Sequence, residues 1–187
     1  MKKMKKIIYL FALLFVHNLF SQDESLDNQF KVEFNFISTG ISYEMPINDS
    51  FLLDLSLGIG GGYRLNSGFT GEWILNSPPA GFGKAELKYY YNREKRVKKG
   101  KNNINNAGNY IAFQTKYNTE RFSMPNDINI EPLNKVLLNE IHWGLQRSLG
   151  GNWLFNFHLG LGFARDFDFS ENSVYPALGI KFSYKLF

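Results

Sequence analysis

Three side chains in the last third of the chain have the types and spacing to do chemistry together: Glu140, His142 and His158. Glu140 and His142 lie two residues apart, so they share one face if the segment is a β-strand. A tight turn centred on Gly150 would place His142 directly opposite His158, with the two Cβ atoms a few Å apart. Two imidazoles and a carboxylate could then bind a metal ion or move protons.

A plainer interpretation is that these three residues fill the inside of a small barrel with hydrogen bonds, since barrels of about eight strands pack their interiors with side chains. We favour it, and so predict no catalytic residue, no metal and no cofactor, with Glu140, His142 and His158 kept only as a candidate cluster. Ligand-binding residues cannot be named from the sequence.

Other chemical motifs are missing or weak. The glycines of 58–62 form no phosphate loop, because no Lys-Ser/Thr follows them, and no Gly-x-Ser-x-Gly motif occurs. The basic run 93–101 could meet anionic lipid or a periplasmic partner, but such a run is more often a solvated turn. Charges with inward parity should form an ion-pair network, because buried charges need partners: Glu44, Asp54, Glu86, Lys88, Glu140, Lys181 and Lys185.

The elements that would position these residues are β-strands. Residues 51–64 alternate between bulky apolar side chains and small or polar ones, which predicts one long strand with one oily face. Similar patterns predict strands over 84–92, 109–117, 137–146, 153–163 and 178–186. Long loops are expected over 65–80, 118–135 and 167–175, and a basic, Asn-rich connection over 93–108.

The first strand segment, 30–45, is ambiguous because its apolar parity flips between Phe36 and Ile41. Either one strand carries a bulge near Gly40 or the chain makes a tight turn there. Outer-membrane barrels have an even number of strands with both termini in the periplasm. The turn gives eight strands and the bulge seven, so we prefer the turn.

The first 21 residues are typical of a signal peptide. Four lysines precede the apolar run 7–16, which is too short to span a bilayer, and Ser21 offers a small residue for cleavage. Without this segment the 21 basic residues fall to 17, equal to the 17 acidic ones. The mature chain then has no net charge to attract nucleic acid.

Residues 22–187 are expected to form one domain that sits in the outer membrane. The chain has no cysteine for disulfides, and no other apolar run approaches the length of a spanning helix. A membrane protein without such helices must be a closed barrel. The sequence therefore predicts an all-β, eight-stranded, antiparallel, transmembrane up-and-down barrel whose oily face meets lipid. The alternative is a soluble, lipocalin-like ligand-binding barrel with its oily face inside.

Several segments resemble the small outer-membrane β-barrel proteins of Bacteroidota, many of which have no known function. The matching segments are 40–44, 86–91, 143–150 and the aromatic closing strand. The resemblance implies insertion by the outer-membrane assembly machinery, which reads a C-terminal aromatic strand; here Phe187 has the parity of Lys185. We expect a non-enzymatic protein, structural or interacting with an unidentified partner through its external loops. A lipid-modifying barrel enzyme is the other alternative.

Overall fold

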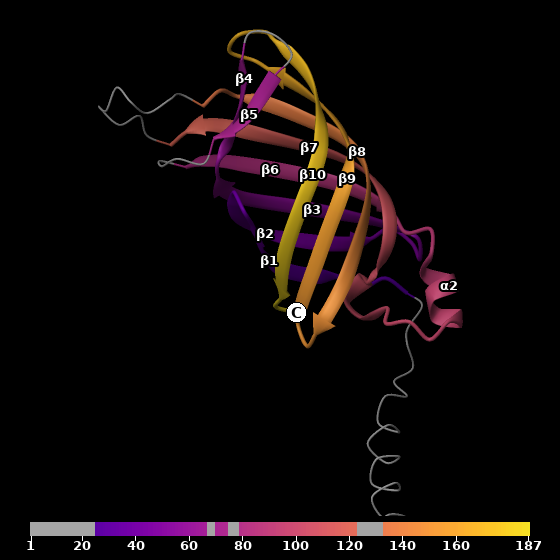
Figure 1. Ribbon diagram of the computed structural model, residues 1–187. Helices are drawn as coiled ribbons and strands as arrows, with labels where there is room; N and C mark the ends of the chain where they lie inside the picture. Colours follow the sequence, from indigo (N-terminus) through magenta and orange to yellow (C-terminus); the bar gives the residue numbers. More distant parts are fainter. Residues whose placement is uncertain (1–24, 67–69, 75–78, 123–132) are drawn as a thin grey trace, which may run out of the picture.

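The computed structural model describes residues 25–66, 70–74, 79–122 and 133–187. These residues form a closed, antiparallel, up-and-down β-barrel of eight strands (Figure 1), which confirms the predicted fold class. The segment expected to be a signal peptide, residues 1–21, lies outside the described residues. No helix in the described part of the chain is long and apolar enough to cross a membrane.

The barrel closes where the first strand pairs with the last, for example at Val32 opposite Tyr184. Its strands are β1 (Gln29–Asn35), β2 (Ser38–Pro46), β3 (Phe51–Gly60), β6 (Ala80–Tyr89), β7 (Gly108–Arg121), β8 (Val136–Gly150), β9 (Trp153–Asp166) and β10 (Asn172–Lys185). A separate hairpin, β4 (Gly62–Asn66) and β5 (Thr70–Ile74), lies between β3 and β6 in the chain.

The parity flip near residue 37 is a hairpin, as preferred, and the single bulged strand is wrong. β1 and β2 pair with Phe34 opposite Thr39, so Phe36 and Ile37 form a two-residue turn. Each even-numbered residue of β1 is therefore paired with an odd-numbered residue of β2, as Val32 is with Ile41. The apolar even positions of β1 and the apolar odd positions of β2 then lie on the same face of the sheet. The Asn35 side chain fixes the turn by accepting hydrogen bonds from the Ile37 and Ser38 amides.

Two predicted boundaries are wrong because strand pairing, not side-chain alternation, decides where a strand ends. The strand predicted over 51–64 stops at Gly60, where its partner β2 begins at Ser38. The β4–β5 hairpin begins at Gly62, inside the predicted strand, and its second strand β5 lies inside the predicted loop 65–80. β10 begins at Asn172, inside the predicted loop 167–175, because β9 supplies partners as far as Arg165.

Apolar side chains face outward along the barrel. Leu57, Ile141, Leu161 and Leu178 are each about two-thirds exposed, at 65%, 65%, 68% and 66%. The inward positions of the barrel strands carry buried polar and charged side chains, including Glu44, Asp54 and Lys88. A lipocalin-like barrel would have the opposite distribution, with its apolar side chains inside.

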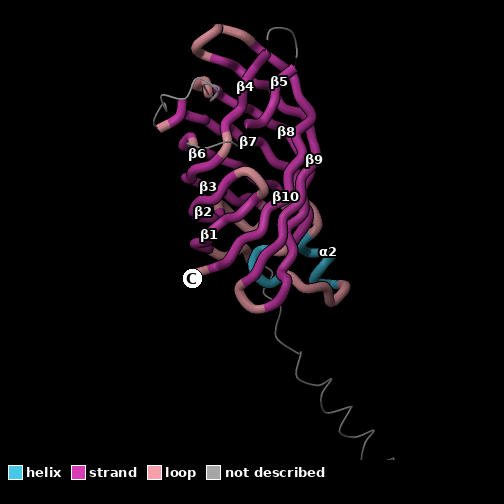
Figure 2. The backbone as a smooth tube through the Cα atoms, turned by 60° about the vertical axis from the view of Figure 1, so that its left-hand side comes forward, coloured by secondary structure: helices cyan, strands magenta, loops and turns pink. Residues whose placement is uncertain are grey.

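The two ends of the barrel differ (Figures 1 and 2). The end that holds the C-terminus also carries the β6–β7 connection, with helix α2 (Arg93–Lys98) and the short 3-10 helix η2 (Ile104–Asn106). We call this the C-terminal end. The β4–β5 hairpin lies at the opposite end.

Candidate functional site

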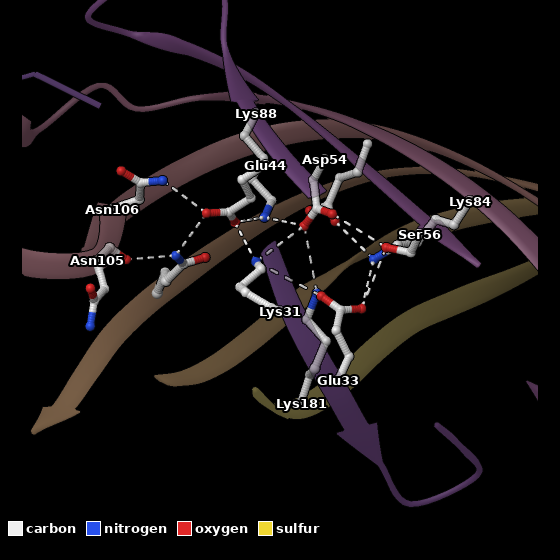
Figure 3. Close-up of polar contacts among 12 residues, drawn as sticks. Lys31, Glu33, Glu44, Asp54, Ser56, Lys84, Lys88, Asn105, Asn106 and Lys181 are labelled. Carbon is white, nitrogen blue, oxygen red and sulfur yellow. Dashed lines mark hydrogen bonds and ion pairs between the residues drawn. The ribbon is translucent and has the colours of Figure 1, made fainter. Parts of the chain in front are cut away.

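The part of the lumen nearer the C-terminal end holds a cluster of completely buried charged side chains (Figure 3). Lys88 Nζ lies 2.9 Å from Glu44 Oε1 and 2.8 Å from Asp54 Oδ2. Lys31 Nζ lies 2.8 Å from the same Glu44 oxygen. Two lysines therefore neutralise two carboxylates, which is what charges removed from water require.

The charge cluster continues along the wall through Glu33. Its carboxylate pairs with Lys181 and lies 3.8 Å from Lys84 Nζ, which is 3.4 Å from Glu86. Ser56 donates to Glu33 and Asp54, at 3.4 and 3.3 Å. The expected ion-pair network is therefore present among the described residues.

Sequence reasoning found most of this network but missed part of it. Lys185, expected within it, lies 3.4 Å from the Asn105 side-chain oxygen instead. Lys31 and Glu33 were missed, although they occupy the inward positions between the apolar residues of β1. The odd-even pattern of β1 was the signal that could have identified them.

The cross-strand partner predicted for His142 is wrong. The register places His142 opposite Gly160 and His158 opposite Gly144, because the chain turns at Gly151 and Asn152 rather than around Gly150, and the ladder also shifts by one residue between Ser148 and Gly150. The two imidazoles are therefore diagonal neighbours. Their rings still stack, with centroids 4.4 Å apart and an angle of 27° between the planes, since Gly160 leaves room beside His142 and Gly179 leaves room beside His158.

Glu140 joins the histidines within a hydrogen-bonded group. Its Oε2 accepts from Gln114 Nε2 at 2.9 Å and its Oε1 accepts from the Tyr175 hydroxyl at 2.8 Å. The same carboxylate lies 3.5 Å from His142 Nδ1 and 3.8 Å from His158 Nε2. His142 Nε2 is 3.2 Å from Glu86.

The predicted metal-ligating atoms of Glu140, His142 and His158 do come within 4.8 Å of one another. Stacked imidazoles, however, hold their lone pairs in nearly parallel planes, which do not converge on one ion. Both Glu140 oxygens already accept hydrogen bonds. The geometry favours the interpretation that this group fills the lumen with hydrogen bonds.

Beside this group lies a cavity of about 290 Å³. It is bordered by charged and polar side chains from the lumen and by apolar residues at the β1–β2 turn and on β10. Its lining includes Glu33, Lys84, Glu86, Lys116, Glu140, Asn156, His158 and Lys181 inside, and Phe36, Ile37, Leu178 and Ile180 at its edge.

Buried apolar clusters fill the lumen on both sides of this cavity. Toward the C-terminal end the cluster consists of Leu26, Leu52, Tyr90, Tyr110 and Ala112. Burial raises the pKa of the Tyr90 phenol well above its usual value, so its hydroxyl stays protonated. Toward the other end the cluster consists of Val136, Leu138, Ala164, Tyr175 and Ala177.

The β6–β7 connection acts as a plug at the C-terminal end, which the sequence did not predict. Asn105 and Asn106 both adopt φ of 56°, a left-handed conformation that asparagine tolerates. Asn106 Nδ2 donates to Glu44 Oε2 at 2.9 Å, and the Asn105 carbonyl accepts from Gln146 at 2.9 Å. The connection is thereby tied to the lumen charges.

The basic run at the start of this plug is only partly the solvated turn that was expected. Lys95, Lys98, Lys99 and Lys101 are exposed. Arg93 is buried and donates to the Ser25 carbonyl at 2.5 Å. That contact fastens the segment before β1 to the plug.

Comparisons with protein-family models, curated proteins and solved structures give no match for this chain. Functional inference therefore depends on the barrel, its charged lumen and its apolar exterior.

Proposed function

We propose that this protein spans a bacterial outer membrane as a barrel and acts without enzymatic activity, through a structural role or through partners that meet one end of it. The single observation that carries the proposal is the exposed apolar band on the outer face of the strands. Contiguous apolar surface of this extent marks contact with lipid or protein. A closed barrel leaves no unpaired sheet edge, as a lipid environment demands.

Aromatic pairs support the same location. At the C-terminal end the rings of Phe51 and Tyr89 lie 4.9 Å apart, and those of Trp153 and Tyr184 lie 5.1 Å apart. Tyr117 and Phe167 form a further pair near the opposite end of the barrel, at 6.2 Å. Aromatic girdles at both membrane interfaces are typical of outer-membrane barrels.

The C-terminal residue also lies on the outer surface. The strand β10 ends at Lys185, after which Phe187 stacks on Phe30 with ring centroids 5.4 Å apart. Phe187 therefore does not follow the inward–outward alternation of β10, and its ring lies on the outer surface. The aromatic residues Phe182 and Tyr184 on the outer face of β10 support the proposed use of the outer-membrane assembly machinery and the proposed relationship to small barrels of Bacteroidota.

With the C-terminal end of the barrel in the periplasm, the β4–β5 hairpin, Phe122 after β7 and the segment between β9 and β10 would face the outside of the cell. Phe122 and Phe169 are 62% and 66% exposed at that end, and aromatic side chains are common anchors of protein interfaces. We propose that these segments carry the interaction surface.

The location is tested by fractionating cells that express the full chain and comparing the gel mobility of unheated and boiled samples. We expect the protein in the outer-membrane fraction, with a mobility that changes on boiling because the closed barrel resists detergent. A purified chain that stays folded and monomeric in buffer without detergent would contradict the proposal.

A further inference from the structure

The ladder between the first and last strands of the barrel is short on one side of the cavity, and β5 of the separate hairpin also contacts β10. The ladder between β1 and β10 runs only from Lys31 opposite Lys185 to Asn35 opposite Lys181. The ladder between β9 and β10 continues to Asn172 opposite Arg165. The first nine residues of β10, Asn172 to Ile180, therefore pair with β9 but have no partner in the β1–β10 ladder.

The cavity reaches the outer surface at this place. Its lining passes from lumen side chains such as Glu86 and Asn156 to Phe36 and Ile37 in the β1–β2 turn and Leu178 on β10. Phe36 is 81% exposed. Leu178 and Val174, both on the part of β10 that extends past β1, belong to the exposed apolar residues. The edge of the cavity thus lies within the apolar band.

Buried side chains lie on both sides of the cavity along the barrel axis. Tyr90 and Tyr110 lie toward the C-terminal end, and Leu138 and Tyr175 lie toward the other. The exposed residues Phe36 and Leu178 in the lining mark the gap between the β1–β2 turn and β10 as an opening of the cavity.

The cavity interior has the chemistry of a site for a neutral polar group. Lys84, Lys116 and Lys181 line it together with Glu33, Glu86 and Glu140, so the formal charges cancel. Asn156 is 2% exposed, and neither its Nδ2 nor its Oδ1 has a hydrogen-bond partner among the described residues. A buried amide without partners is costly, and a hydroxyl group could both donate to and accept from it.

From these observations we infer that the opening admits a single-chain amphiphile sideways from the bilayer, with a neutral hydroxyl-bearing head in the lumen cavity beside Asn156. The volume of about 290 Å³ is near the lower limit for small-molecule sites. It suits a head of glycerol size, and the acyl chain stays outside against Phe36 and Leu178. The inference rests on the proposed membrane location.

The route can be tested with single cysteines, because the natural chain has none. Asn156→Cys is reconstituted in phosphatidylcholine vesicles and treated with N-dodecylmaleimide or with a permanently charged methanethiosulfonate reagent. We expect the lipid-soluble reagent to label it, and the charged reagent to react at least about tenfold more slowly, because a fixed charge is excluded from the hydrocarbon layer. Equal or faster labelling by the charged reagent would overturn the lateral route, as would labelling by neither.

Two matched cysteines separate the possible failures. Leu161→Cys lies in the apolar band and should react with N-dodecylmaleimide wherever the barrel is inserted. Ser183→Cys faces the lumen on β10, is completely buried and does not line the cavity, so it should stay unlabelled. No selective labelling of Leu161→Cys would contradict the membrane location and the inference together. Selective labelling of Leu161→Cys but not of Asn156→Cys would overturn the inference alone.

Occupancy is tested with 1-monolauroylglycerol as the probe, on Ser38→Cys in the same vesicles, because Ser38 lines the same cavity and the Asn156 amide stays in place. We expect it to slow alkylation of the cysteine at least about fivefold, while dodecane at the same concentration has no effect, because the head and not the chain enters the cavity. No protection by the glyceride, or equal protection by dodecane, would overturn the assigned head group.

Discussion

At the scale of single residues, the lumen contains charged side chains that are buried away from water and form ion pairs with one another. Lys88 and Lys31 are completely buried and share the Glu44 oxygen between them. Such a cluster adds little stability compared with an apolar core, but removing one member leaves an uncompensated charge inside. Replacing a single charged residue of the lumen should therefore destabilise the barrel, even if the whole network contributes little to the free energy of folding.

Replacing Lys88 by Met should lower the free energy of unfolding by about 3–5 kcal/mol, because Glu44 and Asp54 lose their shared partner. Denaturant unfolding of the refolded protein in detergent micelles measures it. The control is Lys98→Met in the exposed pair with Glu94, where the change should be much smaller because water screens the pair. Equal effects of the two substitutions would contradict a buried network.

The histidine pair gives a second prediction at this scale. Zinc titration of the refolded protein should show no stoichiometric site, and His142→Ala should titrate in the same way, because the stacked rings do not direct their lone pairs at one ion. One equivalent of zinc bound by the natural chain and lost in His142→Ala would show that the group is a metal centre.

At the scale of strands, glycines set how closely neighbouring side chains pack inside the barrel. A Cβ on Gly160 would overlap the Ile141 carbonyl oxygen and His142 of the neighbouring strand. A Cβ on Gly162 would overlap the Tyr175 ring, and one on Gly179 would overlap the His158 ring. The glycines of β9 and β10 therefore create the space that the lumen aromatics and histidines occupy.

Gly160→Ala should cost roughly 1–3 kcal/mol of folding free energy, because the added methyl meets backbone atoms that cannot move aside easily. Gly83→Ala is the matched control on β6: the nearest atom to its new Cβ would be Leu57 Cδ2, at 3.5 Å. That substitution should be neutral or stabilise the strand by up to about 1 kcal/mol. Chemical unfolding of both variants, measured side by side, decides whether close strand contact is the cause.

At the scale of the whole molecule, the polarity of the fold is reversed relative to a water-soluble barrel. Charged residues such as Asp54 and Lys88 are completely buried, whereas Leu57 and Leu161 are about two-thirds exposed. In water such an exterior would drive association. In a bilayer it is the favourable arrangement.

Leu57→Arg should therefore hinder insertion, at a cost of roughly 2–4 kcal/mol for a cation near the middle of the bilayer. Phe169→Arg is the control, since Phe169 has a similar exposed fraction, 66%, but lies in the segment between β9 and β10. Its replacement should leave insertion unchanged. Folding into vesicles, followed by the heat-dependent gel shift, compares the two, and equal behaviour would argue against a membrane-facing wall.

The sequence by itself determined the fold class and the contents of the two faces. Apolar and polar side chains alternate along the strands, so the inward and outward faces can be assigned even when a predicted strand end is wrong by several residues. The same alternation identified Asp54, Glu86 and Lys88 as inward charges. The parity flip between Phe36 and Ile41 allowed either a turn or a bulge, and the even number of strands in outer-membrane barrels favoured the turn.

Only the tertiary structure decided which residues meet across the barrel. The position of the β8–β9 turn at Gly151 and Asn152 changed the partner of His142, because a turn sets register through backbone hydrogen bonds that alternation does not encode. The ends of β3 and β10 depended on the lengths of their partners. The plug at Asn105–Asn106 and the opening beside β10 arise from contacts between residues far apart in the chain, such as Asn106 with Glu44. No local pattern in the sequence could specify those contacts.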